Sequence, residues 1–69
     1  MTHKTLGILG GGQLGQMSAI AAKKLGIKTV ILTPDEGSPA SQVADETIVA
    51  AYEDESALKE LAEKTDVIS

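Results

Sequence analysis

The chain has 69 residues, which is enough for one small domain. It contains no Cys, Trp or Phe and a single Tyr, so disulfide bonds are excluded and the core must be aliphatic. The net charge is −4 at pH 7 and the lysines form no basic stripe, which argues against nucleic-acid binding. The N-terminal residues hold no long apolar segment, so we expect a cytoplasmic protein without membrane contact.

The first predicted elements are two strands that enclose a glycine loop and a helix. Residues 5–10 (TLGILG) form a short apolar run ended by glycines, which predicts a buried strand. Residues 14–25 predict a helix, with Gly26 as the residue after its C-cap. Residues 27–32 (IKTVIL) are β-branched and apolar and predict a second buried strand, which Pro34 follows closely. Strand, loop, helix and strand together form one βαβ unit.

The predicted helix over 14–25 carries apolar residues at helical spacing. Its buried face is predicted to contain Leu14, Met17, Ile20, Ala21 and Leu25. Lys23 and Lys24 are expected to face water.

The second half of the chain continues the alternation. A short helix is predicted over 40–44 and a third strand over 47–50. Asp54 is expected to cap a helix over 55–64, and a fourth strand begins at 66–68. The inner face of the helix over 55–64 is predicted to contain Leu58, Leu61 and Ala62.

These elements predict an α/β, Rossmann-like domain with a parallel sheet in the order 3-2-1-4 and helices on both faces. The chain ends at the fourth predicted strand, so we expect residues 1–69 to be an incomplete domain. A small aliphatic core without a disulfide or an evident metal site also indicates one part of a larger protein.

The segment 7–17 (GILGGGQLGQM) carries the main functional signal. Gly10, Gly12 and Gly15 form G-x-G-x-x-G at a predicted strand-to-helix turn. Glycines let a ligand approach the backbone, and the following helix directs unpaired N–H groups at the same place, which suits a phosphate or another polar group. A mononucleotide P-loop is excluded because no lysine follows Gly15.

A dinucleotide site would place an acid at the tip of the second strand to hold the ribose. The corresponding position is Thr33, which cannot replace a carboxylate, while Asp35 lies beyond Pro34 in a turn. Two alternative functions remain open, although both classes of protein normally have an acid at this position. One is the NAD(P)-binding half of an oxidoreductase, and the other is a nucleotide-sensing regulatory Rossmann module like those attached to ion transporters.

The combination of GGGQLGQM, SPASQVAD and DETIVAAYEDESALKELAEKTDVI resembles the N5-carboxyaminoimidazole ribonucleotide synthetase family, the ATPase subunit of phosphoribosylaminoimidazole carboxylase in purine biosynthesis. The resemblance extends from Gly7 to Ile68. Thr33 stands where the family often has Asp, and Gln16 where a basic residue is common.

Family members are ATP-grasp ligases that use ATP, Mg²⁺ and bicarbonate to carboxylate the exocyclic amine of 5-aminoimidazole ribonucleotide through carboxyphosphate. The resemblance implies that residues 1–69 are the N-terminal substrate-binding domain, that the ATP-grasp domains lie outside the chain, and that the full protein is a homodimer. The chain alone is then expected to be inactive and to hold no cofactor. The residues implied to line the ribonucleotide pocket are Gly10, Gly11, Gly12, Gln13, Leu14 and Gly15.

The remaining polar candidates receive structural interpretations. His3 is interpreted as a tail residue, and the acids at 53–55 as the start of a helix instead of a metal site. Met17 is expected in the core. Tyr52 is expected to cover the edge of the core, with contact to a partner as the alternative. No catalytic residue and no metal ligand is predicted in the chain.

Overall fold

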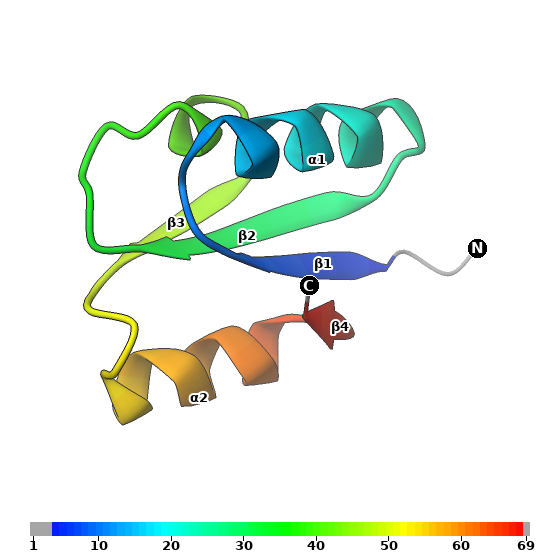
Figure 1. Cartoon of the computed structure of the whole chain (residues 1–69). Coiled ribbons are helices and arrows are strands. Elements are labelled where there is room, and N and C mark those ends of the chain that lie inside the picture. Colours follow the sequence, from blue (N-terminus) through cyan, green and yellow to red (C-terminus); the bar gives the residue numbers. More distant parts are fainter. Residues whose placement is uncertain (1–3, 69) are drawn as a thin grey trace.

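The computed structural model describes residues 4–68, so His3 lies outside the described residues. The elements in chain order are β1 (Thr5–Leu9), α1 (Gln13–Lys24), β2 (Lys28–Thr33), the 3₁₀ helix η1 (Ala40–Gln42), β3 (Glu46–Val49), α2 (Glu55–Lys64) and β4 (Val67–Ile68). The strands form one parallel sheet in the order β3-β2-β1-β4. Helix α1 covers one face of this sheet and α2 the other (Figure 1). The predicted α/β fold, strand order and two-sided cover are confirmed.

Most predicted element boundaries agree with the structure to within one residue. The second strand begins and ends one residue later than predicted, which brings Thr33 into β2. The short helix predicted over 40–44 is a single 3₁₀ turn over Ala40–Gln42. The helix over 55–64 has the predicted ends.

The core lies on both faces of β2, the central strand, because successive side chains of a strand point to opposite faces. Ile31 is fully buried and packs with Ile8 and Ala19 on the α1 side. Its neighbour Leu32 is also fully buried and packs with Leu61 on the α2 side. The alternation gives each helix its own aliphatic cluster.

Helix α1 buries a different face from the one predicted. Leu14, Met17 and Leu25 are 81%, 65% and 76% exposed, and Ile20 and Ala21 are exposed as well. The face against the sheet carries Ala19 and Ala22. Small side chains let the helix axis approach the strands closely, and apolar spacing alone cannot distinguish this alanine face from the larger one. The predicted burial of Met17 is wrong for the same reason.

The C-terminal end of α1 is fixed by local hydrogen bonds. Ile27 N donates to Ala22 O at 2.8 Å and Gly26 N donates to Lys23 O at 3.1 Å, which is the Schellman pair of bonds. Gly26 has φ +76°, as the predicted position after the C-cap requires.

At the start of α2, Ala57 N donates to Asp54 Oδ1 at 3.1 Å, which confirms the predicted cap. Inside this helix Leu61 is buried and Leu58 half-buried, but Ala62 is exposed and Ala57 takes its place against the sheet.

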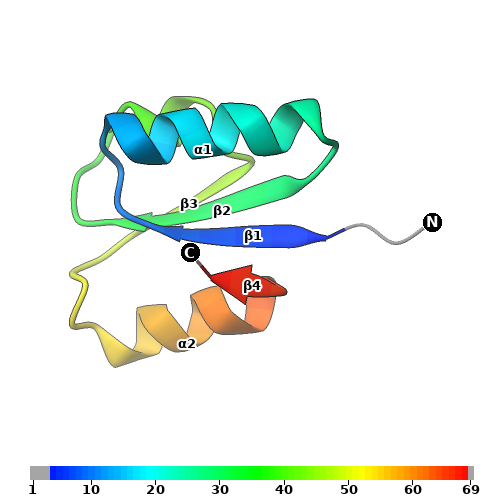
Figure 2. The same ribbon diagram turned by 45° about the vertical axis from the view of Figure 1, so that its right-hand side comes forward.

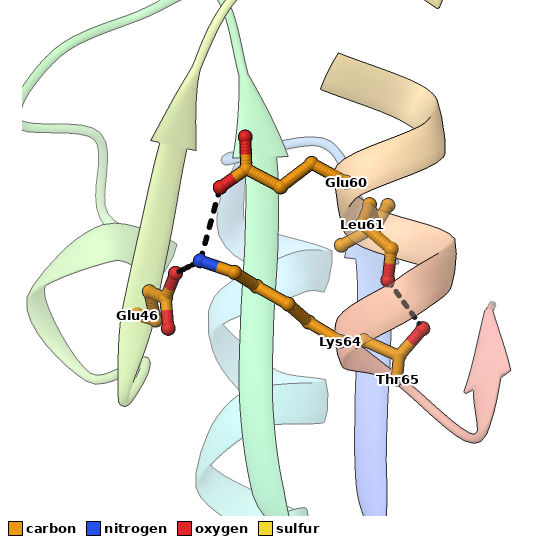
Figure 3. A network of polar contacts seen from close by, with 5 residues as sticks. All are labelled: Glu46, Glu60, Leu61, Lys64 and Thr65. Atoms are coloured by element: carbon orange, nitrogen blue, oxygen red, sulfur yellow. Dashed lines mark hydrogen bonds and ion pairs between the residues drawn. The ribbon is translucent and has the colours of Figure 1, made fainter. Parts of the chain in front are cut away.

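A polar network ties the C-terminal end of α2 to β3. Lys64 Nζ forms ion pairs with Glu46 on β3 and with Glu60 one turn earlier, as Figure 3 shows. Thr65 Oγ1 donates to Leu61 O at 2.7 Å and closes the helix end.

Within the described residues, neither α1 nor α2 has the length and hydropathy needed to cross a membrane.

Candidate functional site

Three connections meet at the carboxyl edge of the sheet: the glycine loop over 10–12, the segment 34–39 and the segment 50–54. They lie together at the left of Figure 1, and the turned view in Figure 2 keeps them at the same end. Gly10 N donates to Leu32 O at 2.9 Å, which joins the glycine loop to the end of β2. Ligands of parallel α/β sheets bind at this edge.

A cavity of about 440 Å³ lies between the end of β1 and the first turns of α1. It is lined by Ile8, Leu9, Gly10, Gly12, Gln13, Leu14, Gly15 and Ser18. Five of the six residues expected at the pocket therefore surround one cavity. The sixth, Gly11, does not line it. Ser18, one turn beyond Leu14, adds a hydroxyl group that the glycine motif did not indicate.

The cavity adjoins the positive end of the α1 dipole. The N-cap residue Gly12 provides no side-chain cap, and no acidic residue lies in the first turn. The first N–H groups of a helix have no partner within the helix, and they carry partial positive charge. This end of α1 is therefore suited to an anionic or strongly polar ligand group.

Gly11 does not line the cavity and is buried next to Ser38, in the segment that follows β2. A β-carbon at this position would clash with Ser38 Oγ and would lie 2.7 Å from Ser38 Cβ and 2.9 Å from Thr33 Oγ1. Ala40 N donates to Gly11 O at 3.1 Å. Only glycine fits at this contact, which holds the loop against its neighbour.

Thr33 occupies the strand tip where a dinucleotide-binding unit has its acid, and it is fully buried. Its hydroxyl accepts a hydrogen bond from Asp35 N at 3.2 Å. Ser38 is 6% exposed and fills the space beside it. Asp35 is exposed in the turn. The position of the ribose-binding acid is thus occupied by packed hydroxyl groups, which disfavours both dinucleotide alternatives.

Tyr52 approaches the glycine loop from the segment between β3 and α2. A β-carbon at Gly10 would lie 3.6 Å from Tyr52 Oη, and the side chain is 44% exposed. Sequence periodicity could not find this neighbour, because the contact joins two loops far apart in the chain. Tyr52 therefore borders the glycine loop, in addition to any role at the edge of the core.

A second cavity of about 410 Å³ lies at the opposite, amino edge of the sheet. Its charged residues are Lys28, Asp45, Glu46 and Lys64. The hydrogen bonds to Glu46, and then to Glu60, raise the pKa of Lys64 above its ordinary value. Lys64 forms ion pairs with Glu46 and Glu60, and Asp45 Oδ2 accepts a hydrogen bond from Thr29 N, so these groups are engaged within the fold and lie away from the glycine loop. Among the described residues, no three His, Cys, Asp or Glu side chains gather as a metal site.

Residues 3–69 match the family model described as the ribonucleotide synthetase preATP-grasp domain. The chain is 58% identical to the N5-carboxyaminoimidazole ribonucleotide synthase of Brucella melitensis over 65 residues, which cover 94% of this chain and 18% of that protein. The solved structure of the Staphylococcus aureus N5-carboxyaminoimidazole synthetase with ADP superposes with a TM-score of 0.95 at 50% identity, and the match covers 100% of this chain and 19% of that one.

A third relative is the N5-carboxyaminoimidazole synthase of Aspergillus clavatus, solved in complex with ADP and 5-aminoimidazole ribonucleotide. It superposes with a TM-score of 0.84 at 34% identity, and the match covers 96% of this chain and 18% of that one. The chain spans 17–18% of the length of the first curated relatives that it matches.

Proposed function

Because the chain belongs to the family of ribonucleotide synthetase preATP-grasp domains, we propose that it is the N-terminal part of an ATP-dependent ligase of purine biosynthesis. The ligase would carboxylate the exocyclic amine of 5-aminoimidazole ribonucleotide with bicarbonate and form N5-carboxyaminoimidazole ribonucleotide. The 69 residues would supply part of the ribonucleotide site and would be inactive alone. ATP and Mg²⁺ would bind to parts of the ligase outside these residues.

The observation that carries this proposal is the cavity at the glycine loop. Gly10, Gly12, Gln13, Leu14 and Gly15 surround it. The uncapped end of α1 offers N–H groups to a polar or anionic part of the ligand. A relative with the same fold has been solved with 5-aminoimidazole ribonucleotide. We therefore assign these residues to substrate binding and Gly11 to the support of the loop.

The proposal extends to the setting of the enzyme. A biosynthetic ligase of this kind would work in the cytoplasm as a homodimer. The exposed apolar side chains of Met17 and Leu25 along α1 support self-association, because large apolar residues grouped on a surface favour an interface. Met17→Glu should then convert a dimer of the ligase into a monomer in analytical ultracentrifugation. If the Met17→Glu variant remains a dimer, α1 is not part of the interface.

The test of the substrate assignment is an NMR titration of the ¹⁵N-labelled chain with 5-aminoimidazole ribonucleotide, AMP and NAD⁺. We expect the ribonucleotide alone to shift the amide signals of residues 10 and 12–15 in a saturable way. A saturable shift with NAD⁺ and none with the ribonucleotide would contradict the assignment and support the dinucleotide alternative.

Two exposed leucines of α1 provide a matched pair of variants for this titration. Leu14 lines the cavity, whereas Leu25 lies at the other end of the helix, and both are largely exposed. Leu14→Glu should abolish the ribonucleotide shifts, because its carboxylate repels the phosphate at the cavity. Leu25→Glu should leave them in place. Equal effects of both variants would move the binding site away from this cavity.

A further inference from the structure

We propose that Ser38 and Thr33 are positioning residues that brace the glycine loop and hold it in the conformation that binds the ribonucleotide. The proposal rests on the proposed function, because it names what shapes the same site. Neither residue lines the cavity, and both lie beside Gly11, which does not line the cavity either. Their effect on binding would therefore pass through the backbone of the loop.

The glycine loop contacts Ser38 and Thr33 closely at Gly11. A β-carbon at Gly11 would lie 2.7 Å from Ser38 Cβ and 2.9 Å from Thr33 Oγ1. At Gly12, the next residue, a β-carbon would meet nothing within 4 Å. The loop is thus packed tightly on one side at Gly11 and is open at Gly12. Tight packing at a single glycine fixes the position of a backbone that would otherwise have wide conformational freedom.

The segment that contains Ser38 is itself held in place by hydrogen bonds. Ser38 Oγ accepts from Ser41 N at 3.4 Å, and Ser41 Oγ donates to Ser38 O at 2.7 Å. Ala40 N donates to Gly11 O at 3.1 Å, and the Ala40 side chain is fully buried. The segment 38–41 is therefore a closed turn that contacts the loop through both packing and a backbone hydrogen bond.

The glycine loop has to take up one conformation when it binds a ligand. Three consecutive glycines have many accessible conformations, and fixing them on ligand binding costs conformational entropy. A loop that is held before the ligand arrives avoids this cost and binds more tightly. The side chains of Ser38 and Thr33 carry the atoms nearest to the place of a β-carbon at Gly11, so the removal of their hydroxyl groups should loosen the loop without altering any residue that lines the cavity.

The experiment combines native-state hydrogen exchange with the titration by 5-aminoimidazole ribonucleotide, in the complete ligase that contains these residues and in three of its variants. Ser38→Ala and Thr33→Val each remove one hydroxyl of the brace, and the valine keeps the shape of the threonine. Thr29→Val is the matched control, because Thr29 is also a buried threonine of β2 but lies at the opposite end of the strand. Two variants of the brace keep the test valid if one fails to fold.

The reporters are amides whose hydrogen bonds are known. Gly10 N and Ala40 N report on the loop, because they donate to Leu32 O and Gly11 O. Leu58 N, which donates to Asp54 O in α2, reports on the whole domain. We expect Ser38→Ala and Thr33→Val to accelerate exchange at the loop amides about tenfold more than at Leu58. The control should accelerate all three amides by the same factor.

Ribonucleotide affinity should fall about tenfold in the two brace variants and remain at the wild-type value in folded Thr29→Val. Uniform acceleration of exchange in the brace variants would overturn the proposal, since the residues would then contribute only to global stability. Unchanged affinity in the presence of a loosened loop would overturn it as well. If the wild-type ligase binds no ribonucleotide, the proposed function of the site fails, whereas the exchange data still decide whether the brace exists.

Discussion

At the scale of single residues, neighbouring glycines of one loop have different physical reasons to be glycine. Gly10 has φ +118°, a backbone conformation that other residues rarely adopt. Gly11 leaves no space for a side chain, whereas Gly12 has ordinary dihedral angles and open space around it. The sequence motif predicts a loop built for close approach, but it cannot assign these separate roles, because they depend on contacts with Ser38 and Thr33.

This difference predicts the stability of two alanine variants. Gly11→Ala should lower the free energy of unfolding by about 2 kcal/mol or more, because the new methyl group clashes with buried atoms. Gly12→Ala should change it by less than about 0.5 kcal/mol, since the reduced freedom of the unfolded chain offsets the poorer helix cap. Urea denaturation followed by far-ultraviolet circular dichroism measures both. Equal losses in the two variants would contradict the packing at Gly11.

Lys64 gives a prediction for alkaline pH. The hydrogen bonds to Glu46 and Glu60 raise the pKa of Lys64 in the folded chain above 10.5. A folded-state pKa above the unfolded value means that the contribution to stability is complete below the unfolded pKa and is lost as pH rises through the folded pKa. The unfolding free energies of the wild type and of Lys64→Met should therefore differ at neutral pH and converge above pH 10.5.

The control for this experiment is Lys59→Met, which removes an exposed lysine from the same helix. Because Lys59 forms no ion pair with another described residue, Lys59→Met should lack the salt-sensitive loss of stability expected for Lys64→Met. High salt should reduce the effect of Lys64, because the ion pairs are exposed to solvent. A gap between wild type and Lys64→Met that does not close with rising pH would contradict the ion-pair interpretation.

At the scale of elements, the two helices differ in how well sequence predicts their packing. The cap at Asp54, the ends of α2 and the buried Leu61 follow from local rules, because each depends on residues within one or two turns. The buried face of α1 does not. Its inner residues are small because Gly15 and Ala19 pass close to the strand and the loop, and a β-carbon at Gly15 would lie 2.7 Å from Gly10 O.

The observed packing of α1 predicts that substitution of its small buried alanine will cost more stability than substitution of its large exposed methionine. Met17→Gln should change the free energy of unfolding by less than about 0.5 kcal/mol, because Met17 is 65% exposed. Ala19→Leu should cost about 1–3 kcal/mol, because it adds volume at a fully buried position. Urea denaturation of the two variants compares them directly. A larger loss of unfolding free energy for Met17→Gln than for Ala19→Leu would indicate that the face predicted from periodicity is the buried one.

At the scale of the whole molecule, the parallel sheet places the glycine loop at its carboxyl edge, where the sequence predicts it. The strand order and the cover by α1 and α2 follow from the alternation of apolar strands and helices and from the preference for right-handed connections. The contacts of Tyr52 with the loop and of Ser38 with Gly11 join segments far apart in the chain. Such contacts depend on the finished sheet, so local sequence patterns do not specify them.

The measurement that tests the central claim most directly uses the protein encoded by the complete reading frame that contains these 69 residues. The purified protein is supplied with ATP, Mg²⁺ and bicarbonate, and ADP formation is followed with and without 5-aminoimidazole ribonucleotide. We expect ADP to form when the ribonucleotide is present, in the same molar amount as the carboxylated ribonucleotide. A folded protein that forms no ADP with the ribonucleotide, or a reading frame that ends at Ser69, would contradict the claim that this chain belongs to a working ligase.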